Sequence, residues 1–352
     1  MSTKVLFILK RREDYNPVEH SPLGLSTGLF NSASFVVKML QESNIKTEIE
    51  VAIDNNCIDR LVNKHKPTHV IIEALWVVPS KFAVLTKLHP SVKWIIRLHS
   101  EMPFMAGEGM AMNWVGDYVG FSNLYIGVNT PRMLDETRTF LQIKKNWSKK
   151  ETENRVIYMP NYFPQTYNTK AFNADKDIID IACFGAVRPL KNHLLQAFAA
   201  LKFATKIKKK LHFHINSGRI EMNGQPALHN LQGLFIHLHD AGHRLIHHDW
   251  APREQFLKTC AQMDIGLQCS FSETFNIVNA DLVSQGIPVV GSSEIPWSSY
   301  WFSADPTSSE DIKNKLLLAY NLPQTNVSIH QSKLTKYTNK TRSIWASIFK
   351  TL

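Results

Sequence analysis

Two carboxylates, Glu273 and Asp281, lie eight residues apart around a predicted junction between a loop and a helix. The apolar run at 265–269 predicts a buried strand, residues 270–274 a loop, and the next segment a helix that ends at Gly286. The apolar positions that place this helix against a core are Ile277, Val278, Leu282 and Val283. In a parallel sheet, ligands lie beyond the carboxyl ends of the strands, where helix N-termini direct backbone amides outward. The loop is therefore expected to bind an anion, with a carboxylate on either side that can bind hydroxyl groups. A ligand with phosphate between two diols is a nucleotide sugar.

A second group of candidate residues is cationic. Residues 184–192 predict a strand that ends at Gly185, followed by Arg188, Lys191 and the start of a helix. A guanidinium can donate two parallel hydrogen bonds to a diphosphate, and an ammonium adds a point charge. Because a nucleoside diphosphate gains negative charge as its bond to the sugar breaks, cations held there would favour the transition state. The alternative is a surface arginine and lysine that cap a helix.

The two motifs together resemble the glycosyltransferases of the GT-B fold, specifically the large retaining family four. That family has a glycine-arginine…lysine segment at the start of its C-terminal domain, then a Glu, seven residues, Glu motif and a G-x-P-V-V strand. Glu273 and the segment Gly-Ile-Pro-Val-Val at 286–290 fit this pattern. Asp281 replaces the second glutamate, and the spacing from Arg188 to Lys191 is shorter than the common form.

The resemblance implies roles for these residues. Arg188 and Lys191 would bind the diphosphate, Glu273 the transferred sugar and Asp281 the ribose diol. The further donor-binding residues that it implies are Gly185, Thr274, Phe275, Asn276 and Ile277, the last four through backbone amides. It also implies retention of the anomeric configuration with help from the leaving phosphate, a UDP-sugar as co-substrate, and no other cofactor.

Three features of the N-terminal half agree with the resemblance. Gly24 and Gly28 follow the first predicted strand, where family members bring a loop close to the donor. His99 ends a strand, as does a family histidine near the transferred sugar, and it is expected to be catalytic; a structural histidine is the alternative. Pro160-Asn161 lies where such proteins cross between domains.

Predicted strands alternate with helical segments along both halves of the chain. The strands are expected at 5–9, 47–53, 69–74, 93–98, 124–128 and 156–159, and then at 178–184, 211–216, 244–247, 265–269 and 287–290. Such alternation indicates βαβ units and parallel sheets. The expected fold is α/β of the GT-B type, with two Rossmann-like parallel-sheet domains facing a central cleft.

The expected domain boundaries follow from the same alternation. An N-terminal acceptor-side domain would span 1–165, a polar linker 166–177, and a nucleotide-sugar donor domain 178–330. A basic helical tail at 331–352 would end the chain and could cross back to the N-terminal domain. Short helices are expected at 309–320 and 343–350.

The totals restrict the class of protein. A chain of 352 residues with 44% hydrophobic and 20% charged residues is long enough for two globular domains. No apolar run approaches 18 residues, no signal peptide is recognisable, and the four cysteines have no pairing or metal spacing, so a cytoplasmic location is expected. The net charge of +10 favours a polyanionic partner.

The acceptor is predicted from basic segments that carry aromatic residues. The clearest is 144–150, with Lys144, Lys145, Trp147, Lys149 and Lys150, a composition that suits a phosphate backbone and unstacked bases. Residues 99–104 and the Gly-Glu-Gly segment after them resemble glycosyltransferases of tailed phages, which glycosylate 5-hydroxymethylpyrimidines in DNA. This implies DNA as partner, with base flipping and the host cytoplasm as location. Glu101 and Glu108 are candidates to orient the acceptor hydroxyl, or else loop carboxylates.

Two other functions stay open from the sequence. One is a transferase of cell-surface polysaccharide or lipopolysaccharide, whose basic face would dock on an anionic membrane. The other is a non-catalytic GT-B module that binds nucleotide sugars.

No metal is expected. The D-x-D pattern at 175–177 lies in the predicted linker before a strand, where a metal-dependent transferase would not have it. The histidines at 237, 239, 243, 247 and 248 have no cysteine or carboxylate pattern that would complete a zinc site.

Overall fold

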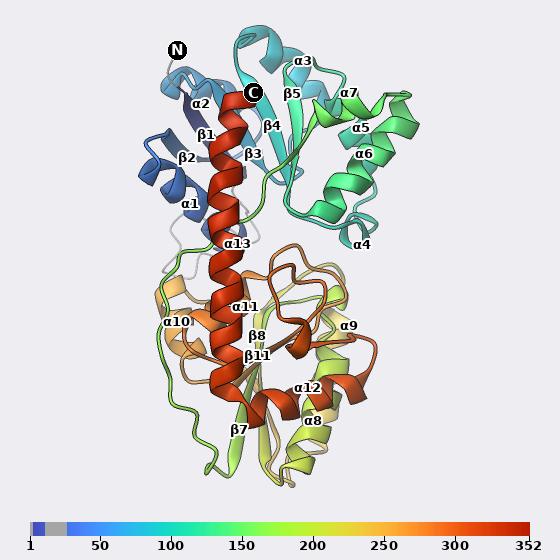
Figure 1. Ribbon diagram of the computed structural model, residues 1–352. Coiled ribbons are helices and arrows are strands. Elements are labelled where there is room, and N and C mark those ends of the chain that lie inside the picture. The colour runs from blue at the N-terminus through green and yellow to red at the C-terminus, as the bar shows by residue number, and fades with distance from the viewer. Residues whose placement is uncertain (1–2, 11–26) are drawn as a thin grey trace. The chain divides into compact units, whose positions relative to one another are not determined.

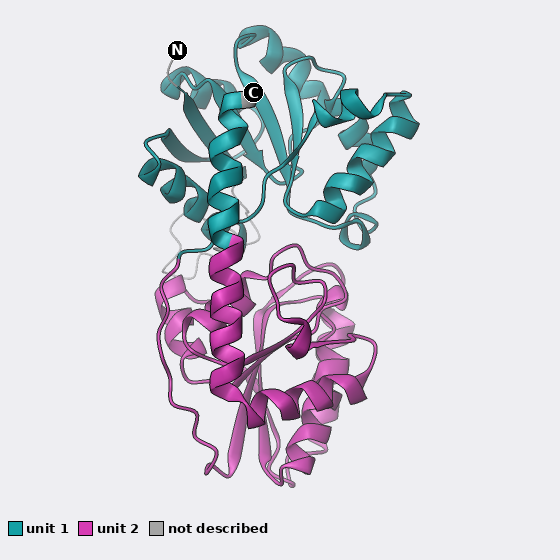
Figure 2. Ribbon diagram, in the orientation of Figure 1, with its two compact units in different colours: residues 1–164, 338–352 teal, residues 165–337 magenta. Residues whose placement is uncertain are grey.

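The computed structural model describes residues 3–10 and 27–352 (Figure 1). The chain divides into two compact units (Figure 2). Unit 1 comprises Met1–Pro164 and Thr338–Leu352, and unit 2 comprises Gln165–Tyr337. Each unit contains one six-stranded sheet with helices around it.

Unit 1 is built on a parallel sheet with the strand order β2-β1-β3-β4-β5-β6. The strands are β1 (Lys4–Lys10), β2 (Lys46–Ala52), β3 (His69–Glu73), β4 (Lys93–Leu98), β5 (Leu124–Val128) and β6 (Val156–Tyr158). The helices are α1 (Thr27–Glu42), α2 (Cys57–His65), α3 (Pro79–Leu88), α4 (Met102–Met105), α5 (Ala111–Tyr118), α6 (Pro131–Lys145) and α7 (Lys149–Glu153).

Both faces of this sheet are buried. Leu6 and Ile8 of β1 pack into one apolar cluster together with Trp94, whereas Val5 and Phe7 point into a second cluster. Alternate residues of a strand point to opposite faces, so burial of both faces requires an uninterrupted apolar strand. This is why the apolar runs of the N-terminal half predicted its strands.

Unit 2 is built on a second parallel sheet with the order β12-β11-β10-β7-β8-β9. Its strands are β7 (Ile178–Val187), β8 (Lys210–Ile220), β9 (Arg244–His247), β10 (Ile265–Gln268), β11 (Val289–Ser292) and β12 (Ser303–Ala304). Its helices are α8 (His193–Lys206), α9 (Gln225–Ile236), α10 (Arg253–Cys260), α11 (Ile277–Ser284) and α12 (Ser309–Asn321), with the short 3₁₀ turns η1 (Pro189–Lys191) and η2 (Tyr300–Phe302). The predicted α/β class with two parallel sheets is confirmed.

The C-terminal helix α13 (Pro323–Thr351) is longer than the sequence predicted. Its first turns belong to unit 2, where the Asn326 side chain bonds both backbone groups of Val289 at 2.8 and 2.9 Å. Its last turns belong to unit 1, where the buried Trp345 donates a hydrogen bond to the Pro160 carbonyl at 2.9 Å. The early part escaped prediction because two of its buried positions, Asn326 and His330, are polar.

Among the helices of the described residues, none combines the length and the apolar character needed to cross a lipid bilayer.

Candidate active site

The two predicted motifs of unit 2 meet at the carboxyl edge of its sheet. They follow β7 and β10, which are neighbouring parallel strands. The Phe271 amide donates to the Leu190 carbonyl at 2.9 Å. The Asn192 side chain donates to the Cys269 carbonyl at 3.1 Å. The loop that carries Glu273 is therefore bonded directly to the segment that carries the cations.

Lys191 and Glu273 form a buried ion pair at the centre of this region. The Lys191 Nζ lies 2.5 Å from Glu273 Oε1, and the two residues are only 9% and 8% exposed. Asn276 Nδ2 donates to the same carboxylate oxygen at 3.1 Å. Burial by itself would raise the pKa of Glu273, but the charges of Lys191 and Arg188 outweigh it and hold the pKa below its ordinary value. Glu273 is thus an ionised acceptor of hydrogen bonds at neutral pH.

The backbone at Gly185 positions this pair. Gly185 has φ +113°, a conformation that a residue with a Cβ rarely adopts. Its amide donates to Asn216 Oδ1 at 2.9 Å, and an added Cβ would lie 3.6 Å from Lys191 Cε. The conformation of Gly185, rather than crowding, is therefore what requires glycine here.

The segment before α11 directs backbone amides toward the same place. Asn276 adopts φ 57° and caps the helix by accepting the Asn279 amide at 2.9 Å. The first amides of a helix have no carbonyl of their own helix to bond, so the N-terminus at Ile277 can bind an anion. The side chain of Phe275 is buried and packs against Trp297, so Phe275 can contribute only its backbone. Thr274 lies in this same turn.

Arg188 is held in an ionic cluster beside the pair. Its Nη1 lies 3.4 Å from Glu221 Oε2, and Arg219 lies 2.5 Å from the other oxygen of the same carboxylate. The Arg219 guanidinium also lies 5.0 Å from the centroid of the Trp250 ring. The sequence motifs did not indicate Arg219, because it comes from the end of β8, far from either motif along the chain.

Asp281 has a different environment from Glu273. It is 3% exposed and lies 2.6 Å from the Arg253 guanidinium. Burial raises the pKa of Asp281 to about 6, and the charge of Arg253 offsets only part of this effect. Arg253, at the start of α10, is a second residue that sequence reasoning missed.

His193 is a third residue that the sequence did not indicate. It begins α8 and is 2% exposed, and among the described residues neither ring nitrogen has a hydrogen-bond partner. Burial, together with the charges of Lys191 and Arg188, lowers the pKa of His193 to about 3, so its ring is neutral. An uncharged ring with unmet hydrogen-bonding capacity beside two cations suits a site that is completed by a ligand.

His99 lies at the carboxyl edge of the sheet in unit 1. Its Nε2 contacts the carboxylate of Glu73, a residue with no exposed surface. Arg97 donates to the same carboxylate at 3.0 Å and to Asn161 Oδ1 at 2.7 Å. Burial lowers the pKa of His99, while Glu73 opposes the shift. The sequence named His99 but not Glu73, which orients its ring.

The other predicted site residues of unit 1 differ in burial. Glu101 is buried, accepts from Thr130 Oγ1 at 2.5 Å and pairs with Arg132 at 2.9 Å, which is the geometry of a structural carboxylate. Glu108 is exposed between α4 and α5. Gly28 lies in the first turn of α1, and Gly24 lies outside the described residues.

The basic segment 144–150 lies at the other edge of this sheet. α6 starts just after the carboxyl end of β5, and the chain must return to the amino edge before it enters the parallel strand β6. Lys144 and Lys145 end α6, and Lys149 and Lys150 begin α7. Trp147 is half-buried, with the Arg155 guanidinium 5.9 Å from its ring centroid. The structure therefore does not bring this segment together with His99.

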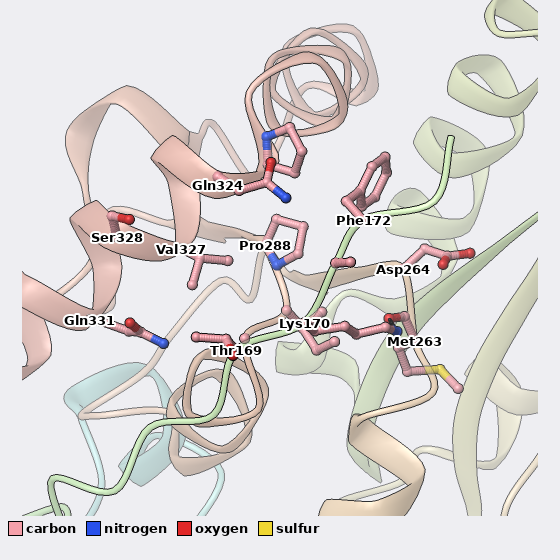
Figure 3. A pocket seen from close by; sticks show the side chains of 14 residues that line it. Thr169, Lys170, Phe172, Met263, Asp264, Pro288, Gln324, Val327, Ser328 and Gln331 are labelled. Atoms are coloured by element: carbon pink, nitrogen blue, oxygen red, sulfur yellow. Dashed lines mark hydrogen bonds between the residues drawn. The ribbon is translucent and has the colours of Figure 1, made fainter. Parts of the chain in front are cut away.

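A pocket of about 140 Å³ lies at the amino edge of the sheet in unit 2 (Figure 3). Thr169, Lys170 and Phe172 of the segment before β7 line one side, Gln324, Val327 and Ser328 of α13 line the other, and Pro288 lies between them. Lys170 Nζ donates to the Met263 carbonyl at 2.6 Å. Because Glu273 lies at the carboxyl edge, this pocket is separate from the candidate active site.

No family model matches the chain, and no curated protein matches its sequence. Solved structures nevertheless share its fold over nearly the full length. A trehalose-6-phosphate synthase, studied for glycosyltransfer with retention, is similar at 12% identity and a TM-score of 0.65, over 99% of each chain. Sucrose-phosphate synthase from Thermosynechococcus elongatus is similar at 11% identity and a TM-score of 0.66, over 99% of this chain and 98% of that one. HepE from Anabaena, in complex with UDP and glucose, is similar at 11% identity and a TM-score of 0.62, over 99% of this chain and all of that one.

The chain has the GT-B fold. In this GT-B chain the candidate active-site residues of unit 2 come from the last residues of four neighbouring strands, β10, β7, β8 and β9, or from the segments that follow them. The carboxyl edge of a parallel sheet is where such folds bind ligands.

Proposed function

We propose that this protein is a glycosyltransferase that moves a sugar from a UDP-sugar to an acceptor hydroxyl with retention of configuration. The observation that carries the proposal is the buried pair of Lys191 and Glu273, next to Arg188 and the N-terminus of α11. The similar structures support it, since they are two sugar-phosphate synthases and a protein in complex with UDP and glucose.

The cations would act on the leaving group. Arg188, Lys191 and the first amides of α11 would hold the diphosphate as the bond from its oxygen to the anomeric carbon breaks. The acceptor oxygen bonds the anomeric carbon on the same face, and its proton passes to the leaving phosphate oxygen. Charge that develops on the diphosphate is therefore stabilised by groups that are already in place.

The carboxylates would select the donor. Ionised Glu273 can accept hydrogen bonds from sugar hydroxyls while Lys191 balances its charge. Asp281 would accept hydrogen bonds from the ribose hydroxyls while it keeps its ion pair with Arg253. In unit 1, His99 is proposed as a catalytic residue whose ring is oriented by Glu73.

For the acceptor we propose a 5-hydroxymethylpyrimidine in DNA. The support is the net charge of +10 and the exposed Lys144, Lys149 and Lys150 of the basic segment 144–150. Since those lysines lie at the amino edge of their sheet, their part would be to hold the phosphate backbone at a distance from the reacting base. The Trp147 ring packs beside the Arg155 guanidinium, so we do not assign it the role of stacking on a DNA base.

The test is a turnover assay on the full chain. The protein is incubated with a panel of UDP-sugars and with hydroxymethylated DNA, plain DNA or no DNA, and UDP release and nucleoside mass are measured. We expect UDP release with one sugar, and a mass increase only in hydroxymethylated DNA. UDP release with no mass change in any DNA would remove the DNA acceptor, and no UDP release with any sugar would remove the enzymatic function.

A further inference from the structure

A second group of polar side chains lies outside the candidate active site, on the first half of β7 and β8. Asp180 of β7 is in register with His212 of β8, and His214 lies two residues further along. Residues two apart on a strand point to the same face, so one carboxylate and two imidazoles share one face of the sheet. Nitrogen and oxygen ligands of this kind suit zinc and its neighbours among the divalent transition metals.

The spacing of the three ligand atoms matches one tetrahedral ion. Asp180 Oδ1 lies 3.1 Å from His214 Nε2 and 3.3 Å from His212 Nδ1. All three atoms lie within 4.8 Å of one another. Two ligands bound at about 2.0–2.1 Å to tetrahedral zinc lie about 3.4 Å apart. An ion could therefore enter with little movement of the strands.

Neighbouring groups already orient the ligands. The second ring nitrogen of His214 lies 2.8 Å from His248 Nε2, and the two rings stack with their centroids 5.1 Å apart. A metal-bound histidine normally has such a hydrogen-bond partner for its other nitrogen. Lys176 lies 3.0 Å from Asp180 Oδ2, which leaves Oδ1 directed at the two imidazoles.

The charges permit a cation despite the nearby lysine. Lys176 also bonds both oxygens of Asp264 at 2.9 and 2.8 Å, so Asp264 balances its charge. The negative charge of Asp180 then remains for an ion. Arg244 is in register with His212, and its guanidinium donates to the backbone carbonyls of His239 and His243 at 2.6 and 3.0 Å.

The site is also accessible. The side chains of His212, Asp180 and His214 are 26%, 19% and 9% exposed. An ion could reach them from solvent, and water could fill the fourth position of a tetrahedron.

We propose that Asp180, His212 and His214 form a binding site for a divalent transition-metal ion, with zinc the best match. The ion would join β7 to β8 and stabilise unit 2. Asp180 precedes the end of β7 by seven residues, which is roughly 20 Å of extended strand. The ion is therefore placed to stabilise the fold and not to act on the donor. The sequence did not indicate this site, because none of its ligands belongs to the histidine cluster at 237–248 and only strand pairing brings His212 and His214 to Asp180.

The experiment uses tag-free, EDTA-treated full-length protein titrated with zinc chloride by calorimetry, with thermal unfolding in parallel. We expect one zinc per chain with a Kd in the micromolar range or below, and a Tm that rises with zinc. His214→Gln and Asp180→Asn should each weaken binding at least tenfold. His248→Gln should weaken it about 10- to 100-fold by loss of the outer hydrogen bond. His237→Gln, at an exposed histidine of the same unit, is the matched control and should bind as the unaltered protein does.

Two outcomes would overturn the proposal. One is the absence of zinc binding and of any Tm shift in the unaltered protein. The other is equal affinity in the unaltered protein and a His212→Gln/His214→Gln variant that keeps its far-ultraviolet circular dichroism. Loss of turnover in the UDP-sugar assay would leave this test unaffected, since zinc binding is measured without donor.

Discussion

The Lys191–Glu273 and Arg253–Asp281 pairs of unit 2 each place a cation against a buried carboxylate, but the pKa values of the two carboxylates shift in opposite directions. Two cations, Lys191 and Arg188, and the Asn276 amide surround Glu273, and together they lower its pKa despite its burial. One guanidinium faces Asp281, and burial prevails, so its pKa rises to about 6. Burial alone therefore does not decide the charge of a carboxylate, because the cations and hydrogen-bond donors around it can outweigh burial. The first pair suits permanent contact with an anionic ligand, and the second can exchange its proton near neutral pH.

The largest effect should come from Lys191→Ala. We expect kcat to fall about 10²- to 10³-fold, because a cation that stabilises the leaving group is lost. UDP release measures this, and Lys202→Ala, which removes a partner of the exposed pair with Glu310, should keep full activity.

The same change removes the ion-pair partner of the buried Glu273 carboxylate, which costs about 3–5 kcal/mol of stability. The double variant Lys191→Met/Glu273→Gln should recover the Tm and not the activity. Recovery of both would show that the pair is only structural.

The pH dependence of unfolding should separate the two carboxylates. Asp281 has a pKa of about 6 in the folded chain against an ordinary 3.8, so its contribution is unfavourable above pH 6 and disappears as the pH falls toward 4. The full effect is about 3 kcal/mol. Glu273 has the opposite sign, since its lowered pKa contributes stability that is lost as the pH falls through the folded value.

Urea unfolding from pH 7.5 down to about pH 3 measures both effects, that of Asp281 between about pH 4 and 6 and that of Glu273 below its ordinary pKa of 4.5. In Asp281→Asn the free energy of unfolding should rise more steeply with pH than in the unaltered protein. The reason is that ionisation of Asp281 destabilises the folded chain as the pH rises, and the variant lacks this effect. In Glu273→Gln the free energy of unfolding should rise less. Identical pH profiles for Asp281→Asn and the unaltered protein would contradict the assigned difference.

A smaller effect on stability is expected at Gly185, which lies beside the Lys191–Glu273 pair and forms no part of it. Gly185→Ala should cost about 1–2 kcal/mol, because its φ of +113° is unfavourable for a residue with a Cβ. Gly233→Ala is the matched control: it lies in α9, where an added Cβ meets no atom within 4 Å of the described structure, and it should stabilise by about 0.5–1 kcal/mol. Equal destabilisation of both variants in urea unfolding would contradict the role given to Gly185.

The smallest effect on donor chemistry should follow charge reversal at Lys144, Lys149 and Lys150. We expect weaker DNA binding and a shallower dependence on salt, by about 0.9 in the logarithmic slope for each lost phosphate contact. UDP affinity should not change, since the segment lies at the amino edge of the sheet in unit 1. A loss of UDP affinity in the folded variant would conflict with this placement.

The sequence predicted the parts of the fold that rest on local patterns. Apolar runs indicated the strands of unit 1 because both faces of its sheet are buried, and Gly286 indicated the end of α11, whereas β7 continues past the predicted end at Gly185 to Val187. Long-range partners could not be predicted in this way. Arg253 beside Asp281, Glu73 beside His99, and Asp180 beside His214 are brought together by strand order and helix packing. The early turns of α13 were missed because buried polar residues such as Asn326 hide its apolar face.

The most direct test of the donor site is UDP binding by calorimetry to the unaltered protein, Lys191→Ala and Lys202→Ala. We predict micromolar binding to the unaltered protein and to Lys202→Ala, and at least tenfold weaker binding to Lys191→Ala. Equal UDP affinity in all three proteins, or no binding to the unaltered protein, would contradict the assignment of the Lys191–Glu273 region as the nucleotide-sugar site.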